Sequence, residues 1–188
     1  MAHHAKKFNL IVAACENGGI GNKGGLPWTL KGEMKQFARL TTESEQPNKK
    51  NAVIMGRKTW FSIPEKNRPL KNRINVVVTN SLTDLAPLAY QASSMEDALS
   101  LLCTAPLVDE VDIVWIIGGQ SLYQHAFESA HLHRVYLTKV HGNFECDAFF
   151  PLEQLSKMEQ VVDSRLPQDV QSENGIEYQY QVFQTKTW

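Results

Sequence analysis

The sequence predicts an α/β fold: a single domain with a central, mostly parallel sheet, an antiparallel C-terminal edge hairpin and helices on both faces. Continuous apolar runs bounded by polar loops recur along the chain, as expected for strands covered on both faces. Segments with helical spacing alternate with these runs, which favours a parallel sheet. Near the C-terminus, apolar and polar residues alternate strictly after the tight-turn pair Asn174-Gly175, which indicates a hairpin.

The predicted elements follow one another along the chain. Strands are expected at Leu10–Cys15, Asn51–Met55, Ile74–Thr79, Tyr90–Ala92, Val111–Ile117 and Arg134–Val140. Helices are expected after Thr29 as N-cap, over Ser94–Leu102 with Ser94 as N-cap, and over Gln120–Phe127. Met158–Arg165 and Ile176–Gln184 are expected to pair as antiparallel strands.

The composition fits one globular domain. The chain has 188 residues, 43% hydrophobic and 21% charged, which is enough for a substantial core. The net charge of −1 gives no overall field that would attract nucleic acid or an anionic membrane. The three cysteines are widely spaced and outside any Cys-x-x-Cys pattern, which is typical of free thiols in a reducing compartment. We expect a cytoplasmic monomer without membrane contact, with a domain over residues 8–188 after an N-terminal extension, residues 1–7.

One carboxylate occupies an unexpected position on the first helix. Leu30, Glu33, Met34 and Phe37 fall at offsets 0, 3, 4 and 7, which places them on one amphipathic face. A carboxylate on that apolar face must find strong donors or stay protonated. Taken alone, Glu33 is more simply an edge residue that reaches water, because buried Glu is rare. The glycine-rich loop that ends in Leu26–Trp28 instead indicates a lid beside a ligand site.

Two strand-to-helix turns contain glycine and suit phosphate groups. Gly56 precedes the polar run Arg57–Thr59 at a helix start, where free N–H groups and cations favour an anion. Gly118–Gly119 leads from a strand into the next helix and permits a ligand to approach bare backbone. Neither turn has the Walker or the G-x-G-x-x-G pattern, and each alone is more often an ordinary turn. Together they favour a bound dinucleotide.

In order and at matching separations, these stretches resemble the dihydrofolate reductase family. The similarity extends from Phe8 almost to the C-terminus, and the loop lengths are closest to the vertebrate-type, monofunctional branch. The matching segments are Asn9–Ala13, Gly19–Gly21, Leu26–Trp28, Val53–Leu70, Trp115–Gly119 and Asp147–Pro151.

The resemblance implies an oxidoreductase that converts 7,8-dihydrofolate into 5,6,7,8-tetrahydrofolate for one-carbon metabolism. NADPH is the implied cofactor, its hydride passing to pterin C6 while N5 gains a proton from water. Folate as a further substrate and antifolate inhibitors such as methotrexate are implied partners, and no metal is expected.

Roles in substrate binding follow position by position from the resemblance. Glu33 matches the buried acid that holds the pterin 2-amino group and N3, and Thr138 matches the hydroxyl that supports it. Trp28 matches an indole that reaches the pterin through an ordered water, and Leu26 matches the tip of the lid. Arg73 matches the guanidinium that binds the α-carboxylate of the substrate's glutamate tail. The implied apolar walls are Ile11, Ala13, Met34, Phe37, Ile63, Leu70 and Ile117.

The implied cofactor contacts surround the two glycine turns and the ends of neighbouring strands. They are Ala13, Ile20, Gly21, Gly56, Arg57, Lys58, Thr59, Thr79, Asn80, Ser93, Gly118, Gly119, Gln120, Ser121, Leu122 and Tyr123. The resemblance also implies a cis peptide between Gly118 and Gly119.

The chain departs from the family's pattern at several positions. Thr79-Asn80 and Ser93-Ser94 stand where the family often has basic residues, so the 2′-phosphate of NADPH would rest mainly on Arg57 and hydroxyls. This predicts a weaker preference for NADPH over NADH. Met34 stands where a phenylalanine is usual, and we expect antifolate affinity to shift. One residue is missing ahead of the acid, which leaves the helix start uncertain by about a turn.

Two alternatives stay open from the sequence. A related reductase of flavin-precursor synthesis would share the sheet but should lack the set of Glu33, Thr138 and Arg73. A non-catalytic pteridine- or RNA-binding module on the same fold is disfavoured by the intact acid and, for RNA, by the near-zero net charge. Loss of NADPH absorbance with dihydrofolate separates all three.

Overall fold

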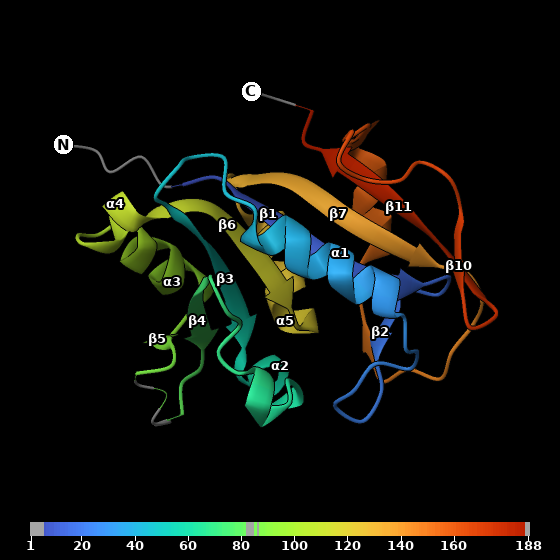
Figure 1. The fold of residues 1–188 in the computed structure, drawn as a ribbon, viewed down its shortest axis with the longest axis horizontal. Coiled ribbons are helices and arrows are strands. Elements are labelled where there is room, and N and C mark those ends of the chain that lie inside the picture. The colour runs from blue at the N-terminus through green and yellow to red at the C-terminus, as the bar shows by residue number, and fades with distance from the viewer. Residues whose placement is uncertain (1–5, 82–84, 86, 187–188) are drawn as a thin grey trace.

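The apolar runs of the sequence become the strands of one central sheet (Figure 1). The computed structural model describes residues 6–81, 85 and 87–186. The strands are β1 (Phe8–Cys15), β2 (Gly19–Gly21), β3 (Lys50–Gly56), β4 (Ile74–Val78), β5 (Tyr90–Ala92), β6 (Val111–Gly118), β7 (Leu132–Val140), β8 (Ala148–Phe149), β9 (Glu159–Val161), β10 (Gln171–Glu173) and β11 (Ile176–Gln184). The helices are α1 (Lys31–Thr42), α2 (Arg57–Ser62), α3 (Met95–Leu102), α4 (Leu107–Glu110) and α5 (Gln120–Glu128), with short 3₁₀ turns η1 (Glu65–Asn67) and η2 (Leu152–Lys157).

The sheet has the predicted mixed topology. Its order is β10-β11-β7-β1-β6-β3-β4-β5, and β9 pairs with β11. The strands from β7 to β5 in this order run parallel. Within the described part of this sheet, the C-terminal strand β11 runs antiparallel to its neighbours β7, β9 and β10. β2 and β8 pair antiparallel in a separate two-stranded sheet. The predicted α/β fold with an antiparallel C-terminal edge is therefore confirmed.

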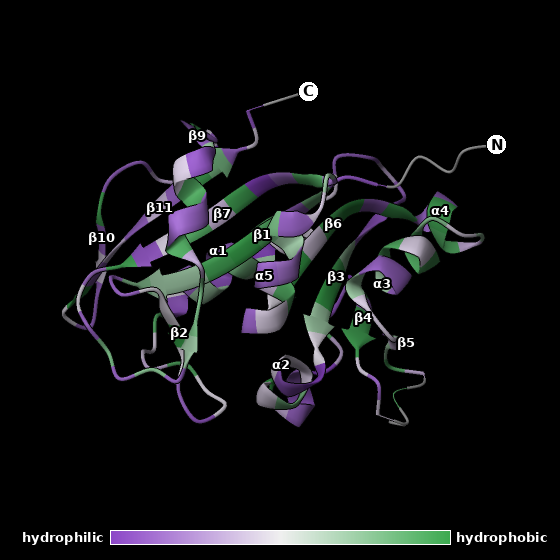
Figure 2. Cartoon of the chain, turned by 180° about the vertical axis from the view of Figure 1, so that it is seen from behind, coloured by the Kyte–Doolittle hydropathy of each residue, from purple (hydrophilic) through white to green (hydrophobic). Residues whose placement is uncertain are grey.

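Alternating side chains give the sheet two buried faces. Leu10 and Val12 of β1 pack into the cluster that includes the apolar faces of α3 and α5. Ile11, between them, packs into the opposite cluster with Leu40 of α1 and Trp60 of α2. Figure 2 shows α3 and α5 lying over the back of the sheet, whereas α1 crosses the front in Figure 1. The helices thus cover both faces, as the doubly buried strands require.

The glycine turns meet at one edge of the sheet. Met55 of β3 lies opposite Gly118 of β6 in the parallel ladder, so both strands end side by side. A Cβ atom added to Gly56 would lie 3.8 Å from the backbone nitrogen of Gly119, which shows how closely the turns approach. The carboxyl edge of a parallel sheet is where α/β proteins bind their ligands. α2 and α5 both begin at this edge.

Two local predictions are wrong. Thr29 is not the N-cap of α1, because the helix begins after Leu30. The predicted strand Met158–Arg165 reduces to the three residues of β9. Its end has a clear cause: the Asp163 carboxylate accepts hydrogen bonds from the backbone and side chain of Arg165, which turns the chain out of the sheet.

Some predicted segments lie partly outside the described residues. Residues 1–5 of the predicted extension lie outside the described residues, as do residues 82–84 and 86 near Pro87. Lys6 is described, and its Nζ donates to the carbonyl of Val111 at 2.9 Å. None of the helices in the described ranges has the length and apolar character that crossing a bilayer demands.

Candidate active site

Glu33 lies on the buried side of α1, as the helical spacing predicts. Its residue exposure is only 7%. The hydroxyl of Thr138 on β7 donates to Glu33 Oε1 at 3.0 Å, across 105 positions of sequence. Burial raises the pKa of Glu33 above its ordinary value, and the bond from Thr138 opposes that rise. The simpler interpretation, an edge glutamate reaching water, is therefore wrong.

A small pocket beneath α1 brings four of the predicted site residues together. Ile11, Glu33, Phe37 and Thr138 all line it. Ala13 lies opposite Thr138 in the β1–β7 ladder. Three further predicted wall residues are half-buried against the same cluster as Ile11: Ile63, Leu70 and Ile117. Met34 is different, because 48% of it is exposed and it does not line this pocket.

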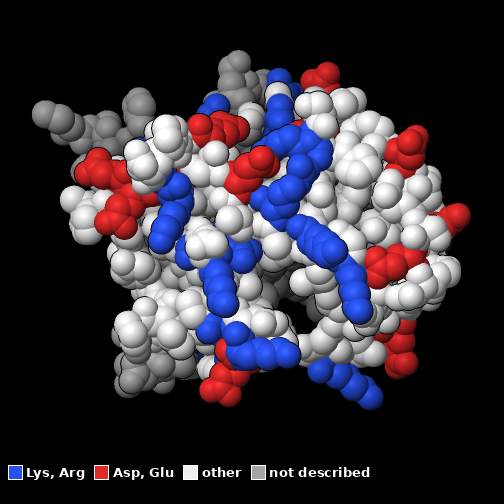
Figure 3. Space-filling view, viewed as in Figure 1, with Lys and Arg blue, Asp and Glu red and all other residues white. Residues whose placement is uncertain are grey.

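Figure 3 shows a hollow in the surface of the molecule. The hollow lies on the face seen in Figure 1, where α1, α2 and the loop after β2 come together. Lys and Arg side chains stand on its rim. A chain with a net charge of −1 therefore presents a locally positive mouth.

Trp28 is buried next to α1, with an unusual polar atom. Its exposure is 5%, and its ring packs edge-on against Phe144 with centroids 5.2 Å apart. The indole Nε1 is buried and has no hydrogen-bond partner among the described residues. A buried N–H of this kind normally has a partner, often a water molecule. The atom thus suits the water-mediated contact that the resemblance implies.

The predicted lid loop is a tight hairpin whose tip is not Leu26. Lys23 and Gly24 both have positive φ, and an Asn22–Gly25 bridge closes the turn around them. Leu26 follows this turn and is 51% exposed. The tip lies earlier than expected because Gly24 readily adopts positive φ. Lys23 N–H donates to the Asp147 carboxylate at 2.9 Å, which ties the turn to the segment before β8.

Arg73 is held in place by two hydrogen bonds. Its Nη1 donates to Thr41 Oγ1 at 2.9 Å, and its Nε donates to the carbonyl of Lys71 at 2.9 Å. The side chain is half-buried, and burial lowers the pKa of the guanidinium below its ordinary value. Because two bonds fix its plane, it is well arranged for a planar carboxylate.

The two glycine turns fit a phosphate-bearing cofactor. Among the described residues, no side chain caps the starts of α2 and α5, whose N-caps are Gly56 and Gly119. By contrast, α3 is capped by Ser94, whose hydroxyl accepts from Asp97 N–H at 3.0 Å. Bare N–H groups at adjacent helix starts suit anionic oxygens. The peptide between Gly118 and Gly119 is cis, as expected.

The side chains around these turns divide into exposed and buried ones. The exposed residues are Arg57, Lys58, Gln120 and Ser121, whereas Ile20, Gly21 and Thr59 are partly exposed. Leu122 and Tyr123 are buried in the core instead. Tyr123 Oη donates to the carbonyl of Ile11 at 2.7 Å, and burial raises the pKa of its phenol. Any contact from these two residues to a phosphate must therefore come from the backbone.

Near β4 and β5, Thr79 and Ser93 stand where the family often has basic residues, and both form local hydrogen bonds. Thr79 Oγ1 accepts from Ser81 N–H at 3.1 Å, and Asn80 is exposed. The backbone and hydroxyl of Ser93 donate to Asp97 Oδ2 at 2.9 and 3.1 Å. The surface around Ser93 thus carries the Asp97 carboxylate at the place where the resemblance implies the 2′-phosphate of NADPH. The described residues contain no group of three or more His, Cys, Asp or Glu able to hold a metal ion.

Sequence reasoning missed one residue that contacts the start of α1. Glu173 of β10 accepts hydrogen bonds from the first backbone N–H groups of the helix that carries Glu33. The Asn174-Gly175 turn signal indicated the hairpin but not what its end would meet.

Comparison with known proteins agrees with the resemblance. The family model described as dihydrofolate reductase matches residues 7–185. The dihydrofolate reductase of Aedes albopictus is 48% identical over 186 residues, covering 95% of this chain and 97% of the relative. That of Sus scrofa is 47% identical over 182 residues, covering 95% and 98%. The solved structure of Schistosoma mansoni dihydrofolate reductase matches with a TM-score of 0.87 and 39% identity, covering 96% of this chain and 98% of that one.

These matches, which span nearly the whole chain, show that it is an oxidoreductase. The chain belongs to the dihydrofolate reductase family.

Proposed function

We propose that the protein reduces 7,8-dihydrofolate to 5,6,7,8-tetrahydrofolate with NADPH, by hydride transfer to pterin C6 and protonation at N5. The observation that carries the proposal is the buried Glu33 with its Thr138 partner. The two oxygens of a carboxylate match the adjacent N–H donors of the pterin 2-amino group and N3. Few ligands offer that paired edge to an acid sheltered from water.

The residues of the chain would bind and orient the reactants. Glu33 would hold the pterin and, through its charge, raise the basicity of N5. Trp28 Nε1 would position a water molecule near the pterin, and Arg73 would bind the glutamate tail. Arg57, Lys58 and the bare N–H groups of α2 and α5 would hold the cofactor phosphates. Bound NADPH supplies the hydride itself.

The cellular setting is part of the same proposal. We infer a cytoplasmic protein, because three free thiols are typical of a reducing compartment. We infer a monomer because the sequence has no coiled-coil pattern. Folate and antifolates such as methotrexate would enter the same site, and the exposed Met34 would alter inhibitor affinity.

The decisive experiment follows NADPH absorbance on addition of dihydrofolate, with NADH in parallel. We expect loss of absorbance that depends on both reactants. Absence of turnover together with quenching of tryptophan fluorescence by a pteridine would favour a non-catalytic binding module. Turnover of a flavin precursor in place of dihydrofolate would favour the related reductase.

A further inference from the structure

The helix that carries Glu33 begins without a cap of its own. The N-cap residue is Leu30, whose side chain forms no capping hydrogen bond with the first turn. Leu30 is apolar and buried, and Thr29 lies one position too early. Glu33 stands at the third helical position, where a glutamate often bonds back to the N-cap, but its carboxylate is turned toward Thr138. The first N–H groups of α1 must therefore find another acceptor.

Glu173 supplies that acceptor from the far end of the sequence. Lys31 N–H donates to its Oε2 at 2.6 Å and Gly32 N–H donates to its Oε1 at 2.8 Å, over separations of 142 and 141 residues. These two backbone bonds hold the pKa of Glu173 below its ordinary value. Both carboxylate oxygens thus bind the helix start, at the positive end of its dipole.

The contact is tight because Gly32 has no side chain. A Cβ atom added there would lie 2.9 Å from Tyr178 Oη and 3.2 Å from Glu173 Oε1. Tyr178 of β11 also packs in one cluster with Trp28 and Leu30, the residues just before the helix. The β10–β11 hairpin therefore rests directly on the first turn of α1.

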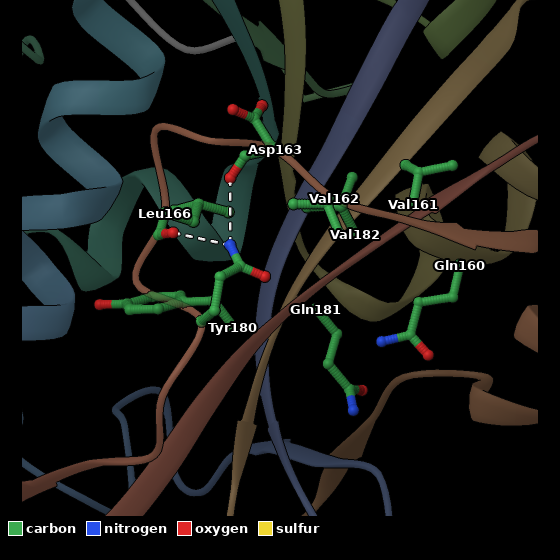
Figure 4. A pocket seen from close by; sticks show the side chains of 9 residues that line it. Gln160, Val161, Val162, Asp163, Leu166, Tyr180, Gln181 and Val182 are labelled. Carbon is green, nitrogen blue, oxygen red and sulfur yellow. Dashed lines mark hydrogen bonds between the residues drawn. The ribbon is translucent and has the colours of Figure 1, made fainter.

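The other end of α1 is also held by the C-terminal segment. Gln36 Nε2 donates to the carbonyl of Arg165 at 3.3 Å, and Arg39 bonds to the same carbonyl. A neighbouring pocket of about 320 Å³ is lined by Leu166 of this loop and Tyr180 of β11. Figure 4 shows both side chains. Both residues also line the pocket of Glu33, so the C-terminal segment forms part of the wall behind the acid.

We propose that Glu173 is a positioning residue for the proposed reduction: by binding the first turn of α1, it sets the direction of the Glu33 carboxylate. The inference rests on the proposed function for its kinetic readout. Glu33 lies one residue beyond Gly32, so a shift of the first turn moves its carboxylate relative to Thr138. The cofactor turns belong to α2 and α5, whereas Glu173 bonds the first turn of α1.

The test compares Glu173→Gln and Glu173→Ala with the matched control Glu177→Gln. Glu177 is an exposed carboxylate on the same hairpin, where it lies 3.8 Å from His141 rather than against α1. We expect KM for dihydrofolate to rise several-fold in both Glu173 variants while KM for NADPH stays within twofold. The control should change neither. Unchanged KM for dihydrofolate, or an equal rise in both KM values, would overturn the proposal.

Gly32→Ala gives an independent test with opposite expectations. Helix propensity alone predicts a more stable α1, because alanine favours helix more than glycine does. The proposal instead predicts the same selective rise in KM for dihydrofolate, because the methyl group would occupy the space of Tyr178 Oη and Glu173. An unchanged KM in this variant would contradict it.

A binding assay separates failure of this inference from failure of the proposed function. Binding of a 2,4-diaminopyrimidine antifolate is followed by tryptophan fluorescence in the wild type, Glu173→Gln and Glu177→Gln. A several-fold weaker Kd in Glu173→Gln alone supports the positioning role even if the wild type turns over no dihydrofolate. Equal Kd values in all three proteins overturn it, whatever the turnover.

Discussion

The helices around the candidate active site begin in two different ways. The difference explains which helices suit the cofactor and which helix positions the acid. α2 and α5 begin at glycines, and among the described residues no side chain caps them. The first N–H groups of α1 are bound by Glu173. An open helix start is available to an anionic ligand, whereas a filled one holds its helix rigidly in place. The first kind suits the cofactor, and the second suits an acid that must be aimed.

The largest expected effect comes from removing the negative charge of Glu33 on α1. Glu33→Gln keeps the shape of the side chain but loses its charge, so hydride transfer at neutral pH should fall by roughly 10²-fold or more. Lower pH should partly restore the rate, because the substrate then binds already protonated at N5. Single-turnover rates across pH measure this, and near-normal turnover at neutral pH would remove Glu33 from the mechanism.

Glu33→Gln should lower activity but raise the stability of the fold at alkaline pH. The pKa of Glu33 is raised in the folded state, so its favourable contribution is complete below the unfolded-state pKa and is lost as pH rises through the folded-state pKa. At pH 8 the buried charge therefore opposes folding. Glu33→Gln should have the higher Tm at pH 8, with the difference shrinking toward pH 4, and thermal unfolding at both pH values checks this.

Straining the glycine turn that leads into the open start of α5 should impair cofactor binding. Gly118 has a φ of +122°, and an added Cβ would lie 3.2 Å from Tyr123 Oη. Gly118→Ala should lower the free energy of unfolding by roughly 1–3 kcal/mol through backbone strain. It should also raise KM for NADPH more than KM for dihydrofolate. An equal rise in both would show that the two kinds of helix start are not separate in function.

A smaller effect is expected in the loop whose Arg165 carbonyl accepts hydrogen bonds from Gln36 and Arg39 of α1. The buried Asp163 carboxylate accepts from Arg165 Nη2 at 2.7 Å, and this bond holds the pKa of Asp163 well below its ordinary range. Its contribution to stability is thus present above the unfolded-state pKa and is lost as pH falls through the folded-state pKa. Asp163→Asn should lower the free energy of unfolding by about 1–3 kcal/mol at pH 7. Urea unfolding at pH 7 and pH 3 should show the loss shrinking in acid.

The smallest expected effect concerns the distal part of the cofactor site. Ser93 donates to Asp97 rather than offering a cation, so the preference for NADPH over NADH should be modest. Ser93→Arg should raise the ratio of kcat/KM for the two cofactors about tenfold, because hydrogen bonds to charged groups are stronger than neutral ones. KM for dihydrofolate serves as the internal control. A strong preference in the wild type would refute the interpretation of this departure.

The fold, the burial of Glu33 and the two glycine turns were predictable because local patterns carry them, whereas the roles of the other site residues rest on the resemblance to the family. The apolar runs marked the strands of the sheet, and helical spacing placed Glu33 on the buried face. The errors fell where a side-chain hydrogen bond, from a distant residue or from a near one, overrides the local pattern. Thr29 is a good capping residue by type, yet Glu173 caps the helix instead. Asp163 shortens the predicted strand to β9 by bonding Arg165.

The sequence alone determined the alternation of strands and helices, the glycine turns at two strand ends and the unusual acid on an apolar helix face, because spacing of 2 and 3.6 residues is a local property. Only the tertiary structure decided that the Thr138 hydroxyl meets Glu33 and that a C-terminal hairpin binds the first turn of α1. Those contacts join residues more than a hundred positions apart, so they depend on which strands become neighbours, and no local pattern contains that choice.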